Sequence, residues 1–308
     1  MKAGALTVVS ECLNIKPLEK VLIVTDRKML RFGKLLYNAS RQINLETFLI
    51  VMEPTSRDGE EPPRIITEAM KKSDVVIAVT YHSISHTKSR KKACEAGARI
   101  ASMPRVTKFS FEKGGLTADY DEVDRLCKKM KKALQDSGKI HITSKNGTDV
   151  SFSVEDRTWH DDEGKIHRSG HWGNLPAGEV ATAPKEGTCN GTIVFDHIGD
   201  FGDKVKLTVK DGYVEEVENS PKLNRVLKQL GERSKLIAEI GIGTNPKAKI
   251  IGNVLEDEKV YGTVHMALGN NLEGGGNNYI QFHVDGIIIK PTLKIDNKTL
   301  IKEGKWKI

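Results

Sequence analysis

Two histidines and four carboxylates in the C-terminal half of the chain have residue types and spacings that suit metal binding. His283 and Asp285 are two residues apart in the segment QFHVDGIII. Residues i and i+2 of an extended strand point to the same face, so we expect this imidazole and carboxylate to project together and hold a cation. Gly286 would leave room for a close backbone approach. The alternative for this pair alone is a His–Asp hydrogen bond on a strand surface.

Glu239 and His265 each lie within an apolar run, LIAEIGIG and TVHMAL. An ionised carboxylate in such a run is costly to bury unless it is paired, hydrogen-bonded or bound to metal. An outward-facing position on a half-buried strand would remove that cost for Glu239. For His265 the alternative is a hydrogen-bonded core histidine. Both residues are therefore candidate ligands rather than assigned ones.

Glu179 and Glu258 complete the set. Glu179 follows the run GNLPAG, which predicts a fixed bend, and Glu258 precedes a predicted turn upstream of His265. Loops that hold an acidic residue this firmly are often functional. The alternatives are a turn or capping role for Glu179 and an ordinary acidic loop residue for Glu258.

The six donors together form a nitrogen and oxygen ligand set without sulfur. Such a set suits zinc, manganese, cobalt or ferrous iron. Five or six ligands can hold two metals ~3.5–4 Å apart around a shared water, as in hydrolases. Two histidines and one carboxylate alone would instead make the facial triad of a ferrous oxygenase. The number of carboxylates at the metal therefore distinguishes the two chemistries.

The elements that must position these residues fall into two parts. Alternating apolar runs and amphipathic segments up to the lysine-rich helix predict an α/β domain with a mostly parallel sheet over residues 1–137. Alternating strands with Asn-Gly and Asp-Gly turns then predict a mainly β, metal-binding catalytic domain over residues 138–308. The Gly-x-Gly-x-x-Gly phosphate fingerprint is absent, which argues against a dinucleotide.

Two further residues are candidate substrate contacts. His86 follows the third predicted strand, and parallel sheets bind ligands at the carboxyl ends of their strands. Trp172 directly precedes the turn that leads to Glu179. A polar loop and a packed tryptophan are the alternatives.

Composition excludes several classes of protein. The net charge is +7, but the lysines are spread out and the densest cluster reads as a solvated helix face, so we expect no nucleic-acid partner. No apolar run reaches the ~18–20 residues that span a bilayer, so we expect no membrane partner. The four cysteines show no CxxC spacing, and the N-terminus lacks a signal-peptide layout, so we expect a cytoplasmic protein.

At these residues the chain resembles the aminopeptidase T/S family of dinuclear metallo-exopeptidases. NLPAGEVATAP, AEIGIG, DEKVYGTVHMALG and FHVDGIII are similar to the family's ligand segments and occur in the same order. The resemblance implies that two divalent ions, zinc, cobalt or manganese, are held by Glu179, Glu239, Glu258, His265, His283 and Asp285. It further implies that Glu179 or Glu258 passes a proton from the attacking water to the leaving amine. We therefore expect a homodimeric, metal-dependent aminopeptidase that hydrolyses a small peptide or amide substrate.

The sequence departs from that family at one catalytic position. Leu272 stands seven residues after His265, where the family places a catalytic tyrosine. The same superfamily includes 2,5-dihydroxypyridine dioxygenase, whose iron triad corresponds to His265, His283 and Asp285. A mononuclear Fe(II) ring-cleaving dioxygenase is therefore the alternative function, with Glu239 and Glu258 outside the triad. A catalytically idle metal-binding relative is a third possibility.

Overall fold

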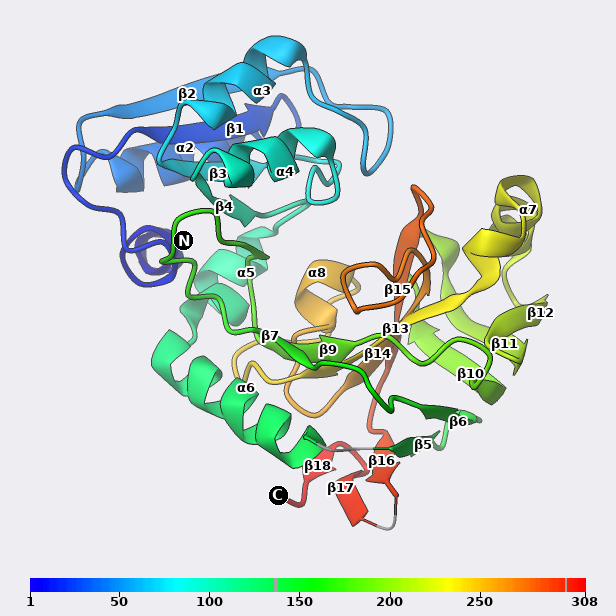
Figure 1. Cartoon of the computed structure of the whole chain (residues 1–308). Helices are drawn as coiled ribbons and strands as arrows, with labels where there is room; N and C mark the ends of the chain where they lie inside the picture. The colour runs from blue at the N-terminus through cyan, green and yellow to red at the C-terminus, as the bar shows by residue number, and fades with distance from the viewer. Residues whose placement is uncertain (136–137, 297) are drawn as a thin grey trace. The chain divides into compact units, whose positions relative to one another are not determined.

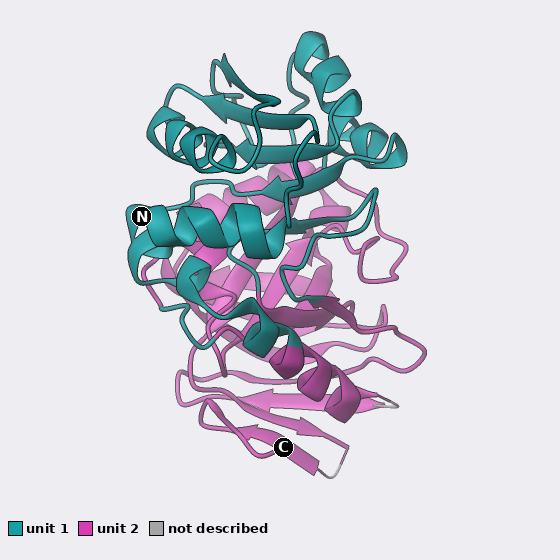
Figure 2. Ribbon diagram, turned by 90° about the vertical axis from the view of Figure 1, so that its left-hand side faces the viewer, with its two compact units in different colours: residues 1–124, 162–177, 246–249 teal, residues 125–161, 178–245, 250–308 magenta. Residues whose placement is uncertain are grey.

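Residues 1–135, 138–296 and 298–308 are described in a computed structural model of the chain (Figure 1). They form two compact units, shown in different colours in Figure 2. Unit 1 comprises residues 1–124, 162–177 and 246–249, and unit 2 comprises residues 125–161, 178–245 and 250–308. Residue 137, where the first predicted domain ends, lies outside the described residues, and that boundary stays a prediction.

Unit 1 is built on a five-stranded parallel sheet with the order β2-β1-β3-β4-β8. Its strands are β1 (Val21–Asp26), β2 (Thr47–Met52), β3 (Val75–Val79), β4 (Arg99–Ser102) and β8 (Trp172–Asn174). Its helices are α1 (Lys2–Leu6), the π-helix η1 (Thr7–Cys12), α2 (Leu30–Ser40), α3 (Arg64–Lys71), α4 (Lys88–Glu95), α5 (Lys108–Glu112) and the 3-10 helix η2 (Gly115–Thr117).

The continuous apolar runs of β1 and β3 are buried along their whole length, as expected for strands covered on both faces. Leu22 and Val24 of β1 pack in one core cluster with Ile66 and Met70 of α3 and with Ala93 of α4. The predicted alternation of strands and helices therefore produces the parallel sheet. The strand β8 joins its edge from a distant part of the sequence.

Unit 2 is a mainly antiparallel sheet with the strand path β18-β17-β16-β5-β6-β10-β15-β14-β13-β9-β7, and β11 and β12 extend it beside β10. Its strands are β5 (Lys139–Thr143), β6 (Asp149–Ser153), β7 (His160–Asp162), β9 (Glu179–Thr182), β10 (Asn190–His197), β11 (Asp203–Lys210), β12 (Tyr213–Glu218), β13 (Ile237–Gly243), β14 (Val264–Gly269), β15 (His283–Ile288), β16 (Thr292–Ile295), β17 (Lys298–Lys302) and β18 (Lys305–Trp306). Its helices are η3 (Gly199–Phe201), α7 (Pro221–Leu230), η4 (Glu232–Lys235) and α8 (Val254–Asp257), and α6 (Tyr120–Leu134) begins in unit 1 and ends in unit 2.

The hairpins form where turn residues interrupt the alternating pattern. Asp211 and Gly212 join β11 to β12 with φ angles of 49° and 86°. Positive φ at both central residues is what a tight two-residue hairpin turn requires, and Asp-Gly is a preferred pair for it. The predicted fold class, an α/β domain followed by a mainly β domain, is confirmed.

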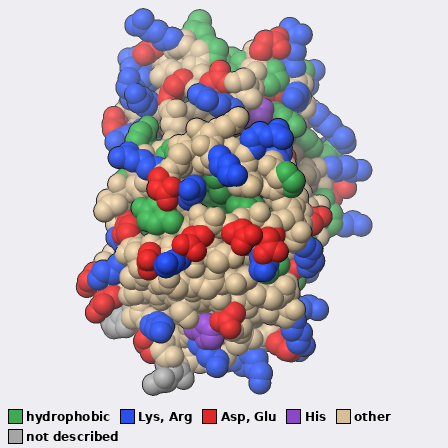
Figure 3. All heavy atoms as spheres, turned by 90° about the vertical axis from the view of Figure 1, so that its right-hand side faces the viewer, with side chains coloured by type: hydrophobic (Ala, Val, Ile, Leu, Met, Phe, Trp, Pro, Cys, Tyr) green, Lys and Arg blue, Asp and Glu red, His purple; other side chains and the backbone are tan. Residues whose placement is uncertain are grey.

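Two surface properties bear on the expected partners. Lysine and arginine side chains are interspersed with acidic ones on the face in Figure 3. Among the described residues, no helix combines the length and apolar character needed to cross a bilayer. The expectations about nucleic acid, membranes, cytoplasmic location and a homodimer stay predictions.

Candidate metal centre

Four neighbouring strands of unit 2, β9, β13, β14 and β15, carry five of the six predicted donors (Figure 1). Glu239 on β13 pairs with Ala267 on β14, which pairs in turn with Asp285 on β15. His265 is two residues before Ala267, and His283 is two residues before Asp285. Because side chains alternate along a strand, this register places all four donors on one face of the sheet. Glu179 begins β9 opposite Gly243 and joins the same face.

Small residues between the donors make room for them. Gly241 pairs with His265, and a Cβ atom at Gly241 would lie only 2.0 Å from Nε2 of that histidine. The imidazole of His265 therefore lies across the backbone of Gly241. Gly286 has a different role from the one predicted. It leaves room for the ring of Phe195, 2.3 Å from where its Cβ atom would be, rather than for a close backbone approach.

Glu239 lies between the two histidines. Its Oε1 atom is 3.4 Å from Nε2 of His265, and its Oε2 atom is 3.6 Å from Nε2 of His283. Nε2 of His283 is also 3.3 Å from Oδ1 of Asp285. Glu239 thus faces the other donors, in contrast to the alternative of a carboxylate that faces solvent by itself. This contact places it beside the histidines of the predicted iron triad.

The orientation of His283 is fixed from outside the cluster. Its Nδ1 atom lies 3.0 Å from the carbonyl oxygen of Asn270, to which it donates a hydrogen bond. This bond leaves Nε2 as the nitrogen that faces Glu239 and Asp285. Metal-binding histidines commonly donate their second ring N–H to a carbonyl or carboxylate in this way.

The remaining donors form a second group around a lysine. Glu258 follows α8, and Lys259 is fully buried beside it. Nζ of Lys259 is 2.6 Å from Oε1 of Glu179 and 2.7 Å from Oε1 of Glu258. The other oxygen of Glu179, Oε2, lies 3.3 Å from Nε2 of His265. Asp257 serves the backbone instead, because it accepts hydrogen bonds from the amides of Ile251 and Gly252.

The donor atoms form two groups, each close enough together to hold a metal ion. One consists of Glu239, His283 and Asp285, and the other of Glu179, Glu258 and His265. Within each group the ligand atoms lie within 4.8 Å of one another. Glu239 connects the groups through its contacts with both histidines.

The charges of the cluster shift its pKa values strongly. Burial disfavours the charged form of His265, but Glu239, Glu179 and Glu258 outweigh burial and raise its pKa to about 9. Burial opposes the charge of His283 in the same way, but Asp285 and Glu239 raise its pKa to about 10. Burial raises the pKa of Glu258 to about 8, although Lys259 acts in the opposite direction. For Asp285, the adjacent His283 overcomes burial and holds the pKa below its usual range.

The residues fit a metal ion because imidazole nitrogens and carboxylate oxygens face one another. Nε2 of His265 and Nε2 of His283 each face an oxygen of Glu239, and Asp285 adds a further carboxylate beside His283. Imidazole and carboxylate are ligands of zinc, manganese and iron. The two donor groups support metal binding.

The two predicted substrate contacts lie in unit 1, whereas all six donors lie in unit 2. The ring of His86 packs edge-on against Trp172, with centroids 6.0 Å apart. The guanidinium carbon of Arg90 lies 3.9 Å from the centre of the same tryptophan ring. A role of His86 and Trp172 in substrate binding stays a prediction.

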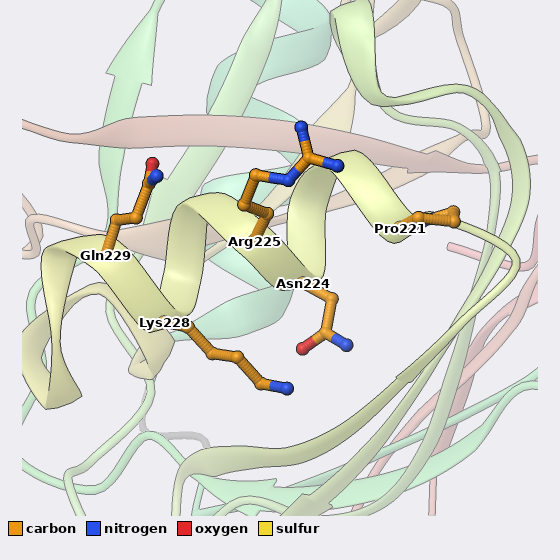
Figure 4. A pocket seen from close by; sticks show the side chains of 5 residues that line it. All are labelled: Pro221, Asn224, Arg225, Lys228 and Gln229. Atoms are coloured by element: carbon orange, nitrogen blue, oxygen red, sulfur yellow. The ribbon is translucent and has the colours of Figure 1, made fainter.

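A pocket beside α7 has no metal-binding character (Figure 4). Its lining contains neither a carboxylate nor an imidazole: Pro221, Asn224, Arg225, Lys228 and Gln229.

Sequence reasoning missed Lys259, the residue that contacts two of the predicted ligands. In DEKVYG it looks like a solvated turn lysine, because the charged residues around it suggest exposure. Its position directly after Glu258, inside a segment of expected ligands, is the one signal that could have drawn attention to it.

Comparisons with known proteins distinguish the two predicted chemistries. Residues 6–307 match the family 2,5-dihydroxypyridine 5,6-dioxygenase. A 2,5-dihydroxypyridine 5,6-dioxygenase of Pseudomonas putida is 23% identical over 192 residues, which cover 56% of this chain. That match spans 55% of the relative's length, so the chain aligns with about half of it.

Two solved structures share the fold. The structure of 2,5-dihydroxypyridine dioxygenase from Pseudomonas putida KT2440 superposes with a TM-score of 0.82 and 17% identity, over 99% of this chain and 96% of that one. Wild-type AmpT from Thermus thermophilus gives a TM-score of 0.74 at 17% identity, over 100% of this chain and 98% of that one. The likeness to AmpT is a likeness of fold.

The prediction of an aminopeptidase, and with it of a hydrolase, metalloprotease and exopeptidase, is wrong. The family match covers nearly the whole chain and names a dioxygenase, which was the alternative. The error has a physical reason, because both chemistries use histidine and carboxylate ligands on the same fold, and short motifs do not reveal the number of metals. With that function, the roles of Glu179 and Glu258 in peptide hydrolysis are withdrawn. The chain belongs to the 2,5-dihydroxypyridine 5,6-dioxygenase family.

Proposed function

We propose that the protein is an Fe(II)-dependent dioxygenase that opens the ring of a hydroxylated pyridine of the 2,5-dihydroxypyridine class. The observation that carries the proposal is the set of His265, His283 and Asp285 on one sheet face, in a chain of this family. Two histidines and one carboxylate are the ligand set of non-haem ferrous oxygenases. Ferrous iron, when bound, supplies the one-electron chemistry that allows dioxygen to react with an aromatic ring.

The side chains of the protein have distinct tasks in this proposal. The hydrogen bond from His283 to the carbonyl of Asn270 keeps Nε2 directed at the metal position. Glu239 contacts both histidines and adds a fourth donor beside the triad. These residues would hold the metal, and their positions are set by the register of β13, β14 and β15.

Glu179 is the candidate proton acceptor for a substrate hydroxyl. Lys259 holds its Oε1 atom, whereas Oε2 is buried and lacks a hydrogen-bond partner in the described part of the chain. A general base needs a free lone pair within reach of the proton that it removes. Oε2 of Glu179 lies 3.3 Å from Nε2 of His265 and would meet that requirement when a metal occupies that nitrogen.

The test is oxygen consumption by protein loaded anaerobically with Fe(II). On addition of 2,5-dihydroxypyridine we expect uptake of about one dioxygen per ring opened, with loss of the aromatic absorbance. Protein loaded with zinc is the matched control and should consume none, because zinc has no redox chemistry. Iron-bound protein that consumes no oxygen with any hydroxypyridine would overturn the proposal and favour an idle metal-binding relative.

A further inference from the structure

Lys259 is a fully buried lysine within the cluster of metal donors. Its ammonium nitrogen lies 2.6 Å from Glu179 and 2.7 Å from Glu258. These are two of the three residues in the second candidate metal group, and His265 is the third. The ammonium group therefore contacts both carboxylates of the second candidate metal group.

Two carboxylates buried this close together need a positive charge between them. Without one, their mutual repulsion and the loss of hydration would disfavour the ionised forms. In dinuclear centres a second divalent ion supplies that charge. In this protein the lysine ammonium contacts one oxygen of each carboxylate and already supplies it.

The backbone keeps Lys259 in this position. Its amide donates to the carbonyl of Glu256 at 3.2 Å, and its carbonyl accepts from the amide of Asn245 at 2.8 Å. The side chain has no exposed surface. A metal ion that entered this group would have to displace the ammonium from both carboxylates into a packed interior.

We propose that Lys259 takes the place of a second metal ion, so that the centre binds one divalent ion, beside Glu239, His283 and Asp285. The inference rests on the proposed function for the presence of that ion. Lys259 explains why the centre holds one ion and not two. An ammonium group has only hydrogen-bond donors and no open ligand position. It cannot share a bridging water with the metal, which two-metal hydrolysis requires.

Metal stoichiometry tests the proposal without any substrate. Purified protein is saturated with Co(II), desalted and analysed for metal content, and the ion count is compared between wild type and two variants. Lys259→Met keeps an unbranched side chain of nearly the same length and removes its charge. Lys294→Met, at an exposed position of β16, is the matched control. We expect one ion per chain in the wild type and the control, and two in Lys259→Met.

A second measurement keeps the proposal testable if Lys259→Met does not fold. Anomalous scattering from cobalt-soaked wild-type crystals should show one peak, beside Glu239, His283 and Asp285. A second peak between Glu179 and Glu258, or two ions per wild-type chain, would overturn the proposal. A folded Lys259→Met protein that still binds one ion would overturn it as well.

These outcomes are distinct from a failure of the proposed function. A chain with one ion and no oxygen uptake would retain the role of Lys259 and lose the dioxygenase. A chain that binds two ions and consumes oxygen would retain the dioxygenase and lose the proposed role of Lys259.

Discussion

Two carboxylates, one fully buried in unit 1 and one half-buried in unit 2, are stabilised in different ways. Asp26, at the end of β1 in unit 1, is fully buried. Its carboxylate accepts hydrogen bonds from the backbone amides of Lys28, Met29 and Tyr81. Glu239 in unit 2 faces two imidazole nitrogens instead, at 3.4 Å and 3.6 Å. The charge of Asp26 is stabilised by backbone dipoles, whereas that of Glu239 depends on neighbouring cations.

The difference shows that burial alone does not identify a metal ligand. A carboxylate that accepts several N–H hydrogen bonds has its lone pairs occupied and stabilises the fold. A carboxylate that faces imidazoles and other carboxylates has lone pairs available for a cation. The groups that contact a buried carboxylate therefore show whether it stabilises the fold or is available to bind a cation.

The largest effect should follow loss of a donor from unit 2. We expect Asp285→Ala to weaken metal binding by more than ~100-fold, because even residues that only support ligands contribute 10–100-fold. Isothermal titration with Co(II) measures the affinity, and circular dichroism checks the fold. A folded variant with near-normal Co(II) affinity would show that Asp285 is not a metal ligand.

The matching substitution in unit 1 should act on stability alone. Asp26→Ala removes three hydrogen bonds to a charged acceptor, so we expect a loss of about 3 kcal/mol in the free energy of unfolding. Thermal unfolding should show a Tm lower by about 10 °C. The metal content should equal that of the wild type, and a change in it would contradict the contrast between the two units.

A methyl group added at Gly241, beside the imidazole of His265, should also weaken metal binding in unit 2. Gly241→Ala places a Cβ atom where the imidazole lies, 2.0 Å from Nε2, so the ring must move. We expect a metal affinity lower by ~10–100-fold, as for loss of a supporting residue. Gly138→Ala is the control, because its Cβ atom would meet only the end of the Asp296 side chain, at 3.3 Å. Equal affinities of the two variants would argue against the steric role of Gly241.

The smallest effect concerns pH. The pKa values of His265 and His283, about 9 and 10, lie above their ordinary value, so both imidazoles are protonated at neutral pH without metal. A metal binds the neutral ring, so binding should release about two protons. Lowering the pH from 7.5 to 7.0 should then weaken binding about tenfold, or ~1.4 kcal/mol. Titrations in buffers of different ionisation enthalpy count the protons, and release of none would show that the imidazoles are neutral or do not bind.

The sequence was sufficient to predict the fold class and to select the donors that the sheet brings together. Both follow from local periodicity: continuous apolar runs for β1 and β3, and the two-residue spacing of His283 and Asp285. The addition of β8 to the parallel sheet was not predicted, because a three-residue strand from a distant segment has no periodic signal. Lys259 was missed for a related reason, since its burial depends on contacts with Glu179, far along the chain. The reaction was misassigned because short ligand motifs do not reveal how many metal ions the donors hold.

Placement of the donors on one antiparallel sheet has a consequence for how such centres diverge. Their positions depend on the hydrogen-bond ladder of β9, β13, β14 and β15, not on a loop that must be rebuilt. A single exchange of side chain on this face would therefore alter ligand type or ion number while the backbone stays unchanged. Short mutational routes between different metal chemistries are then open to a protein of this architecture.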